Sequence, residues 1–311
     1  MRKRIFFLAL ALTILLSGCG APAQPEVPPA DSAVTFTDDL GREVTVEPPE
    51  RVAALIGSFA DIWCLAGGKD TLVAAAHDSW TQFDLGLEDT VADLGSVKET
   101  NLEALLAAKP DFVLASSNTE ANVALLDTLE AAGIPCAYFT VAGFDDYLRL
   151  LDICCRLTGQ EENFRQYGEA LRQQVDDAKA RADGSAPRVL YVRATGASVK
   201  VKNSRDSVLG EMLADLGAVN IADGGSGLLE ELSMEVIIRE DPEHIFVVIQ
   251  GSDPAPAEKL LRQTLLDNPA WEGLTAVKEG RFHVMDPQLY NTKPNARWGE
   301  AYEHLSQILY P

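Results

Sequence analysis

Short apolar runs alternate with helical patterns along most of the chain. In the first half, runs at 52–56, 71–75, 112–115 and 136–139 have the length and composition of strands that are buried on both faces of a sheet. The helical patterns between them, at 59–66, 102–107 and 119–132, each stop at Gly or at a Lys-Pro pair. Two extended pieces at 34–37 and 43–46 flank a turn at Asp39, Leu40 and Gly41. We therefore expect an α/β lobe over 34–143 that opens with a hairpin.

The second half repeats this alternation. Strands are expected at 188–192, 198–201, 245–249 and 282–285, and helices near 207–216, 234–239, 257–266 and 295–309. Between the halves, 145–182 is helical in pattern except at Gly159, which predicts one helix to about Leu157 and a second over about 160–182. The second helix would be roughly 35 Å long, enough to join two lobes.

The predicted fold class is therefore α/β, with two α/β lobes joined by one long backbone helix and a ligand cleft between the lobes. The connecting segment is 144–184 and the second lobe is 185–311. The alternative is an ordinary surface helix inside one larger domain.

The N-terminus indicates export. Arg2, Lys3 and Arg4 precede an apolar run over 5–16, which is too short for a permanent transmembrane helix, so 1–18 reads as a signal peptide. The run ends in Leu-Ser-Gly-Cys19, which resembles the lipobox of bacterial lipoproteins, and Cys19 is the expected site of lipidation. The Pro- and Ala-rich stretch within 19–33 suits a flexible tether. The resemblance implies a lipid anchor, with the Gram-positive cell surface favoured and the periplasm as the alternative. An incidental cysteine is the other interpretation of Cys19.

Charge excludes nucleic acid as a partner. The formal net charge of -21 becomes -24 once 1–18 is removed, because that segment carries three cations and no acid, and no Lys/Arg cluster offsets it. The remaining cysteines, Cys64, Cys136, Cys154 and Cys155, fit no zinc spacing, and core packing is favoured over a disulfide. No motif for a nucleophile elbow, a phosphate loop, a dinucleotide site or a zinc protease is present, so an enzyme is not favoured and no catalytic residue is expected.

Three motifs resemble the substrate-binding proteins of ABC importers for siderophores, haem and cobalamin. They are the segments Phe-Thr-Asp-Asp-Leu-Gly-Arg-Glu-Val at 36–44 with Pro-Pro-Glu-Arg-Val at 48–52, Asn-Leu-Glu-Ala-Leu-Leu-Ala-Ala-Lys-Pro-Asp at 101–111, and Leu-Ser-Met-Glu-Val-Ile at 232–237 with Asp-Pro at 241–242. The resemblance implies two lobes, a metal chelate as cargo, a permease dimer as partner and a monomeric protein. It also implies that Glu103 and Glu235 dock on the permease. Each falls in the first turn of an expected helix, where an acid also stabilises the helix without any further role.

The ligand residues are expected in loops at the carboxyl ends of strands. Arg193, Lys293 and Arg297 are cations in such loops of a very acidic chain, and Trp80, Tyr290 and Trp298 add aromatic surface, a mixture that suits an anionic, partly apolar chelate. Asn118 lies in a further loop of this kind. For several of them an ordinary role stays open: Trp298 as core of the last helix, Lys293 as a solvated charge, and Arg297 as the partner of Glu300 or Glu303.

No resident cofactor or metal is expected. His77, His244, His283 and His304 are scattered along the chain, which speaks against a free zinc or manganese site, although Tyr290 or His77 has the chemistry of an axial haem ligand. An oxyanion such as molybdate, a free metal ion, or a surface lipoprotein without an importer are the remaining alternatives.

Overall fold

The computed structural model describes residues 33–205, 207–251 and 253–311, and the predicted signal peptide, Cys19 and most of the tether lie outside this part of the chain. The stretch Ala33–Pro311 forms one compact unit. Within the described residues, no helix has both the length and the apolar character needed to cross a membrane.

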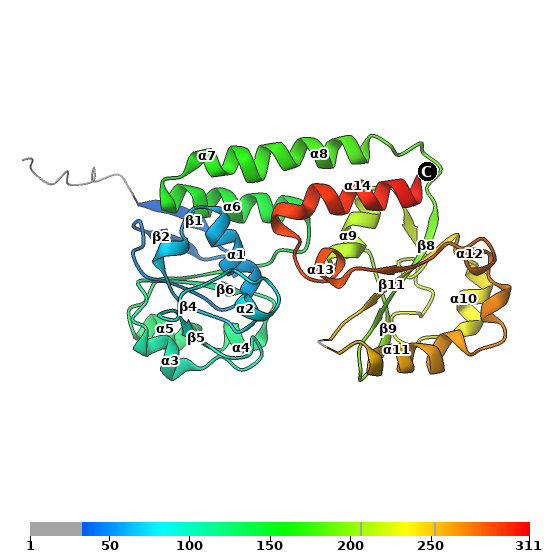
Figure 1. Cartoon of the computed structure of the whole chain (residues 1–311), viewed down its shortest axis with the longest axis horizontal. Coiled ribbons are helices and arrows are strands. Elements are labelled where there is room, and N and C mark those ends of the chain that lie inside the picture. Colours follow the sequence, from blue (N-terminus) through cyan, green and yellow to red (C-terminus); the bar gives the residue numbers. More distant parts are fainter. Residues whose placement is uncertain (1–32, 206, 252) are drawn as a thin grey trace, which may run out of the picture. The chain divides into compact units, whose positions relative to one another are not determined.

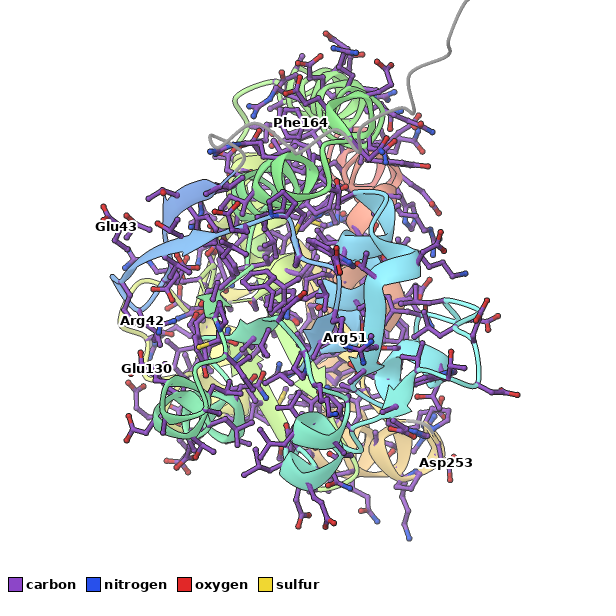
Figure 2. All side chains as sticks on the ribbon, turned by 90° about the vertical axis from the view of Figure 1, so that its left-hand side faces the viewer. Arg42, Glu43, Arg51, Glu130, Phe164 and Asp253 are labelled. Atoms are coloured by element: carbon purple, nitrogen blue, oxygen red, sulfur yellow. The ribbon has the colours of Figure 1, made fainter. Side chains whose placement is uncertain are left out.

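The chain enters the fold through an antiparallel hairpin of β1 (Val34–Thr37) and β2 (Glu43–Val46), as predicted. Its turn is held by Asp38, whose buried carboxylate accepts the backbone N–H of Leu40 and Arg42 and pairs with the Arg42 guanidinium at 2.6 Å. Arg42 also pairs with Glu130 at 3.0 Å, which fastens the hairpin to the first lobe (Figure 2).

A parallel five-stranded sheet of order β5-β4-β3-β6-β7 forms the first lobe (Figure 1). Its strands are β3 (Val52–Ala54), β4 (Leu72–Ala75), β5 (Ala92–Asp93), β6 (Phe112–Ser116) and β7 (Cys136–Phe139). All residues of β3, β6 and β7 are buried, in agreement with the continuous apolar runs in the sequence.

The helices of the first lobe are α1 (Gly57–Leu65), η1 (Lys69–Thr71), α2 (Asp78–Thr81), α3 (Leu102–Ala107), α4 (Glu120–Val123) and α5 (Leu126–Ala131). The prediction of one helix over 119–132 is wrong, because the chain breaks between α4 and α5. The Asn122 carbonyl accepts the N–H of Leu125 and the hydroxyl of Tyr138, and its side-chain oxygen accepts the N–H of Ser116. These bonds to the sheet replace the regular helical pattern.

Consecutive helices connect the two sheets. They are α6 (Phe144–Thr158), α7 (Glu161–Phe164), the π-helical turn η2 (Arg165–Glu169) and α8 (Ala170–Lys179). Gly159 ends α6 in the left-handed conformation, as expected for a helix C-terminus. The helical stretch 161–179 is shorter than the predicted 160–182 and is roughly 28 Å long.

A second parallel sheet, of order β10-β8-β11-β12, forms the second lobe, and β9 pairs with β8 in the antiparallel sense. Its strands are β8 (Arg188–Ala194), β9 (Val199–Lys202), β10 (Val219–Asn220), β11 (His244–Ile249) and β12 (Phe282–Met285). Its helices are α9 (Val208–Asp215), α10 (Met234–Glu240), α11 (Ala255–Leu261), η3 (Arg262–Leu266), η4 (Trp271–Gly273), α12 (Thr275–Lys278), α13 (Pro287–Tyr290), η5 (Asn295–Arg297) and α14 (Trp298–Leu309).

The last helix adds a second tie between the lobes. Helix α14 packs along α8, and both run side by side in Figure 1. Its Trp298 ring lies 5.8 Å from that of Phe144 and 6.2 Å from that of Tyr147, both in α6, and 6.1 Å from that of Tyr302. One hydrophobic core therefore extends from the first lobe through these helices to one face of the second sheet.

Candidate functional site

A pocket of about 330 Å³ lies between the two lobes at the carboxyl ends of their strands. It is lined from the first lobe by Thr81 and Gln82 and from the second by Gln250, Gly251, Pro287, Gln288, Asn291 and Thr292. The lining carries no charged side chain and is polar and apolar in about equal parts, and its amide and hydroxyl groups both donate and accept hydrogen bonds. Open α/β sheets bind ligands at this edge.

The first-lobe side of this pocket is positioned by a close contact of α2 with the start of α1. The N–H of Gly57 donates to Asp78 Oδ1 at 2.9 Å. A Cβ at Gly57 would lie 2.8 Å from the Asp78 carboxyl carbon and from the backbone N of Ser79, so only glycine fits there. Burial raises the pKa of Asp78, and the hydrogen bond from Gly57 acts in the opposite direction. Because Thr81 and Gln82 follow directly, this contact sets their position.

Lys293 follows the pocket residue Thr292. Burial lowers the pKa of Lys293, while the charge of Asp78 acts to raise it. Lys293 is half-buried rather than fully solvated, so the ordinary interpretation as a free surface charge does not describe it.

Asn295 joins the lobes directly and was missed by the sequence analysis. Its Nδ2 donates to the carbonyl of Ser58 at 3.0 Å and to Asp61 Oδ2 at 2.7 Å, both in α1. The residue is fully buried and has φ +48, in the left-handed region that Asn tolerates better than most residues. Burial raises the pKa of Asp61, and the bond from Asn295 acts against that change. The only sequence signal for this role is an Asn directly after Pro294 in a loop.

Several buried polar atoms near this contact have no protein partner. They are Ser58 Oγ, Ser79 Oγ, Asn295 Oδ1 and Trp298 Nε1. Such atoms in native proteins are commonly satisfied by ordered water.

The structure corrects the prediction for Tyr290, and it shows for Arg297 the pairing that the sequence left open. Tyr290 is fully buried, and its hydroxyl lies 3.0 Å from the Ala301 carbonyl, to which it donates, and 3.1 Å from His304 Nδ1, so its ring offers no surface to a ligand. Arg297 is exposed and forms two 2.7 Å hydrogen bonds with Glu300 one helical turn later, the pairing that the sequence left open. Trp298, the other aromatic residue expected at the cleft, is core.

Of the remaining predicted ligand residues, Trp80 lies in α2, and Arg193 and Asn118 lie near the ends of β8 and β6. Trp80 is half-buried next to Thr81 and packs partly on the core. Arg193 is half-buried near the end of β8 and forms no salt bridge with a described residue. Asn118 is exposed after β6 and accepts a 2.6 Å hydrogen bond from the Ser116 hydroxyl. None of the three lines the 330 Å³ pocket itself.

The histidines are less scattered than their sequence positions indicate. His244 Nδ1 lies 3.3 Å from His283 Nε2 on neighbouring strands, and the two rings stack. Burial lowers the pKa of His244 to about 4 and also lowers the pKa of His283. Among the described residues, no group of three or more His, Cys, Asp or Glu side chains is arranged to hold a metal ion.

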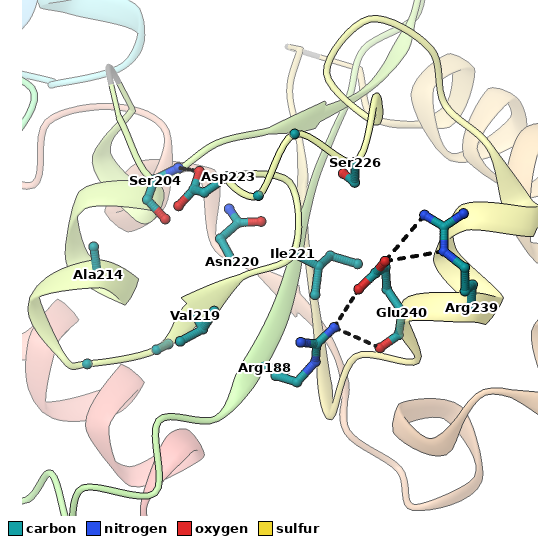
Figure 3. A pocket seen from close by; sticks show the side chains of 14 residues that line it. Arg188, Ser204, Ala214, Val219, Asn220, Ile221, Asp223, Ser226, Arg239 and Glu240 are labelled. Atoms are coloured by element: carbon teal, nitrogen blue, oxygen red, sulfur yellow. Dashed lines mark hydrogen bonds and ion pairs between the residues drawn. The ribbon is translucent and has the colours of Figure 1, made fainter.

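A larger hollow of about 710 Å³ belongs to the second lobe alone and follows the edge strand β10 (Figure 3). Its two arginines, Arg188 and Arg239, both pair with Glu240, at 2.7 and 3.3 Å. We favour the smaller pocket as the ligand site because both lobes contribute to it.

The four cysteines in the described part of the chain are free thiols. Burial raises the pKa of Cys64 and of Cys155 to about 12, and it also raises the pKa of Cys136 and Cys154. Cys136, Cys154 and Cys155 pack in the protein interior, whereas Cys64 is half-buried.

Comparison with known proteins gives consistent results. Residues 52–289 match the model of the family described as periplasmic binding protein. A curated relative, the cobalamin-binding protein of Halobacterium salinarum, is 26% identical over 321 aligned positions, covering 97% of this chain and 84% of the relative.

Two solved structures share the fold. Staphylococcus aureus SirA complexed with staphyloferrin B has a TM-score of 0.68 at 22% identity and covers 89% of this chain and 97% of its own. The periplasmic heme-binding protein RhuT of Roseiflexus has a TM-score of 0.66 at 20% identity, with coverages of 84% and 98%.

Proposed function

Because the chain belongs to the periplasmic binding protein family, we propose that it captures a metal chelate outside the cytoplasm and delivers it to an ABC importer. The observation that carries the proposal is the pocket to which both lobes contribute. A ligand held there contacts both lobes at once, so its binding energy can favour one arrangement of the lobes over another. In this proposal the chelate is cargo, the protein carries no resident cofactor and it catalyses no reaction.

The first candidate for the cargo is a corrinoid. The pocket lining consists of amides, hydroxyls, a glycine and a proline, and the corrin periphery carries neutral amide groups that pair with such a surface. The relative that aligns with 97% of this chain bears the name cobalamin-binding protein, which supports the same choice.

The second candidate is an anionic chelate, either a ferric siderophore or haem. It is favoured by two half-buried cations: Arg193, near the end of β8, has no salt bridge to a described residue, and Lys293 is next in sequence to the pocket residue Thr292. Carboxylate or catecholate groups pair well with such side chains. In this case Trp80 would supply the aromatic contact.

Thermal unfolding of the soluble protein comprising 20–311 tests the proposal. A ligand at 100 times its Kd adds about 2.7 kcal/mol of stability. The panel contains cyanocobalamin, cobinamide, haemin, ferric citrate, a ferric catecholate siderophore, molybdate and zinc. Stabilisation by at least one chelate is expected. Stabilisation by molybdate or zinc alone would replace the cargo class, and no shift with any compound would count against chelate capture.

Matched variants separate the two candidates. Gln82→Ala and Gln288→Ala remove amides from opposite lobes and should weaken corrinoid binding by about tenfold each. Lys293→Met removes a charge and should weaken an anionic chelate by a similar factor while leaving a corrinoid nearly unchanged. Arg297→Met is the control, because that guanidinium is already paired with Glu300.

We further propose that Cys19 anchors the protein by lipid to the outer side of the cell membrane, that the protein is a monomer, and that Glu103 and Glu235 dock on a permease dimer. Both glutamates are exposed in first turns of helices, α3 and α10. Cys19→Ser should release the protein from the membrane fraction, whereas wild type should stay with it.

A further inference from the structure

The outer edge of the second sheet is an open strand beside a groove. Strand β12 pairs with β11 on one side, and no other strand pairs with it in the described part of the chain. A groove of about 500 Å³ is lined by residues of this strand and of the helical stretch α11–η3. Its apolar lining includes Ile249, Leu266, Phe282 and Val284. The first three are half-buried, and Val284 is 58% exposed.

The groove exists because the helix on this face of the sheet lies off centre. Helix α11 packs on β8 and β9, away from β12 (Figure 1). Phe282 meets the ring of Trp271, with ring centroids 5.8 Å apart, whereas most of Val284 stays uncovered. Residues two apart in a strand point to the same face, so Phe282 and Val284 line the groove together.

The free edge of β12 also offers backbone hydrogen bonds. The N–H of Ile245 in β11 donates to the carbonyl of Arg281 at 3.0 Å, and Ile245 pairs with Phe282 in the parallel register. In a parallel ladder this arrangement uses the backbone groups of every second residue from Arg281 onwards, so those of Phe282 and Val284 face away from β11. They form no hydrogen bond with a described residue. The two residues that line the groove therefore also present free donors and acceptors beside it.

The other outer strands of the two parallel sheets are protected. Strands β5 and β10 have only two residues each. Strand β9 carries Lys200 and Lys202, and lysines on an edge oppose the addition of a further strand. In β7 the hairpin turn engages Tyr138, whose carbonyl accepts the N–H of Asp39 at 2.8 Å and whose N–H donates to Asp38 at 3.3 Å. Strand β12 has four residues and neither Lys nor an acid, so within the described residues it is the unprotected edge of these sheets.

Cations lie on the helical wall of the groove. Lys259 and Arg262 line it together with one acid, Glu258, and all three are exposed. Lys259 forms no ion pair with a described residue, and Arg262 lies 3.8 Å from Asp267, which is a weak contact at the surface. In a chain of net charge -21, a wall with more cations than acids is unusual. The groove therefore suits an apolar partner that carries a negative charge.

We propose that this groove binds an extended peptide segment of another protein, which adds to the second sheet as a further strand next to β12. Apolar side chains at every second position of the segment fill the groove, and its backbone pairs with the two free residues of β12. An acidic side chain on the same face of the segment pairs with Lys259 or Arg262.

A second copy of this chain fits the groove less well than such a segment. Two chains of net charge -21 repel each other, and strand β12 contains no acid for the cations. The proposal does not depend on the cargo, because the groove lies within the second lobe alone.

A random heptapeptide library displayed on phage tests the proposal. The bait is the soluble protein comprising 20–311, and phages that also bind the Val284→Lys variant are removed, because a lysine on an edge strand blocks strand addition. The selected peptides should have apolar residues at every second position and an acid on the apolar face. Peptides without this alternation, or no peptide that distinguishes the two proteins, would overturn the proposal.

Fluorescence anisotropy of one selected peptide measures each contribution. Val284→Lys should raise its Kd by about tenfold or more. Val219→Lys is the matched control, because Val219 is 47% exposed on the edge strand β10 of the same sheet, and it should leave the Kd unchanged. Both variants should keep the Tm of wild type. Lys259→Glu combined with Arg262→Glu should weaken the peptide and strengthen a version in which Lys replaces its acid. Equal effects of the two lysine variants, or no reversal of the charge preference, would refute the proposal.

Amide hydrogen exchange followed by NMR reports the added strand itself. The N–H groups of Phe282 and Val284 should exchange fast in the free protein and about tenfold or more slowly with saturating peptide. Unchanged exchange would place the peptide elsewhere, and the proposal would fail. Sedimentation and a lipid-like anion test the other occupants. A wild-type dimer that Val284→Lys dissociates would assign the edge to a second copy, and binding of decanoate with no selected peptide would assign the groove to a small amphipathic anion.

Discussion

Replacing Asn295 by aspartate should destabilise the protein more at neutral than at acid pH. Asn295 Nδ2 donates to the Asp61 carboxylate and to the Ser58 carbonyl, and the residue is fully buried. A hydrogen bond to a charged group contributes about 1.5–3 kcal/mol and one to a neutral carbonyl about 0.5–1.5 kcal/mol. Loss of both should therefore cost about 2–4 kcal/mol, which lowers Tm by roughly 5–15 °C in a protein of this size.

The pH dependence follows from the two carboxyl groups that the variant brings together. Burial already raises the pKa of Asp61, and a second carboxylate at hydrogen-bond distance raises it further. The folded variant then holds a proton that the unfolded chain loses near its ordinary pKa of about 3.9. Stability therefore decreases as pH rises from that value towards the raised pKa of the folded state, and one shared proton restores the bond at acid pH.

Asn295→Gly is the matched control. Glycine accepts the left-handed backbone at this position, so the variant loses the hydrogen bonds without adding a charge. Thermal unfolding of wild type and both variants at about pH 7.5 and pH 4.5 compares them. The aspartate variant should be the least stable at the higher pH and should recover relative to the glycine variant at the lower pH. Equal penalties at the two pH values, or an aspartate variant as stable as wild type, would refute the reasoning.

Three further predictions concern buried groups. Burial raises the pKa of Cys64 and Cys155 to about 12, so the native protein should react slowly with Ellman's reagent at about pH 8. All four thiols, those of Cys64, Cys136, Cys154 and Cys155, should react after denaturation. Fast reaction of these thiols in the native protein would contradict their burial. Tyr290→Phe should lower the free energy of unfolding by about 1–2 kcal/mol, because the hydrogen bonds of the hydroxyl are lost, and should leave the Kd for the cargo unchanged. A large change in Kd would show that Tyr290 contacts the ligand after all. Burial lowers the pKa of His244 to about 4, so on acidification the unfolded chain binds a proton at this histidine before the folded protein does. The free energy of unfolding should therefore fall between about pH 6.5 and pH 4. His244→Gln should reduce that fall in urea titrations, and an unchanged dependence of the unfolding free energy on pH would show that another group causes it.

The bounds of strands and helices were predictable where apolar residues recur at the regular spacing of a strand or of a helix. The hairpin strands β1 and β2, the strand β7 and the helix α3 have the predicted bounds, because each is set by local alternation or by a cap and a stop residue. The helix predicted over 119–132 failed because Asn122 bonds to strand β6 and to Tyr138. Such long-range bonds leave no trace in the local pattern.

The site was only partly predictable, because a strand-end loop gives the position of a residue but not the direction of its side chain. Tyr290 lies in such a loop and nevertheless turns inward. For Trp298 a signal was present, since Trp298, Tyr302, Leu305 and Leu309 follow the spacing of a buried helix face. No local signal pairs Asn295 with Asp61, which are far apart in the chain. The resemblance to a known family singles out Glu103 and Glu235, and their docking role stays a prediction, because no local pattern separates them from other acids in first turns of helices.

The C-terminal helix affects how far the two lobes can move relative to each other, and therefore how the protein would act in cargo uptake. Because α14 belongs to the second lobe, lies along α8 and packs Trp298 against Phe144 and Tyr147, two helical connections rather than one join the lobes. We therefore expect a carrier of this kind to keep nearly the same outline whether it is empty or loaded. In the proposed function, empty carriers would then compete with loaded ones for the same importer, and the rate of uptake would depend on the fraction of carriers that hold cargo as well as on their number.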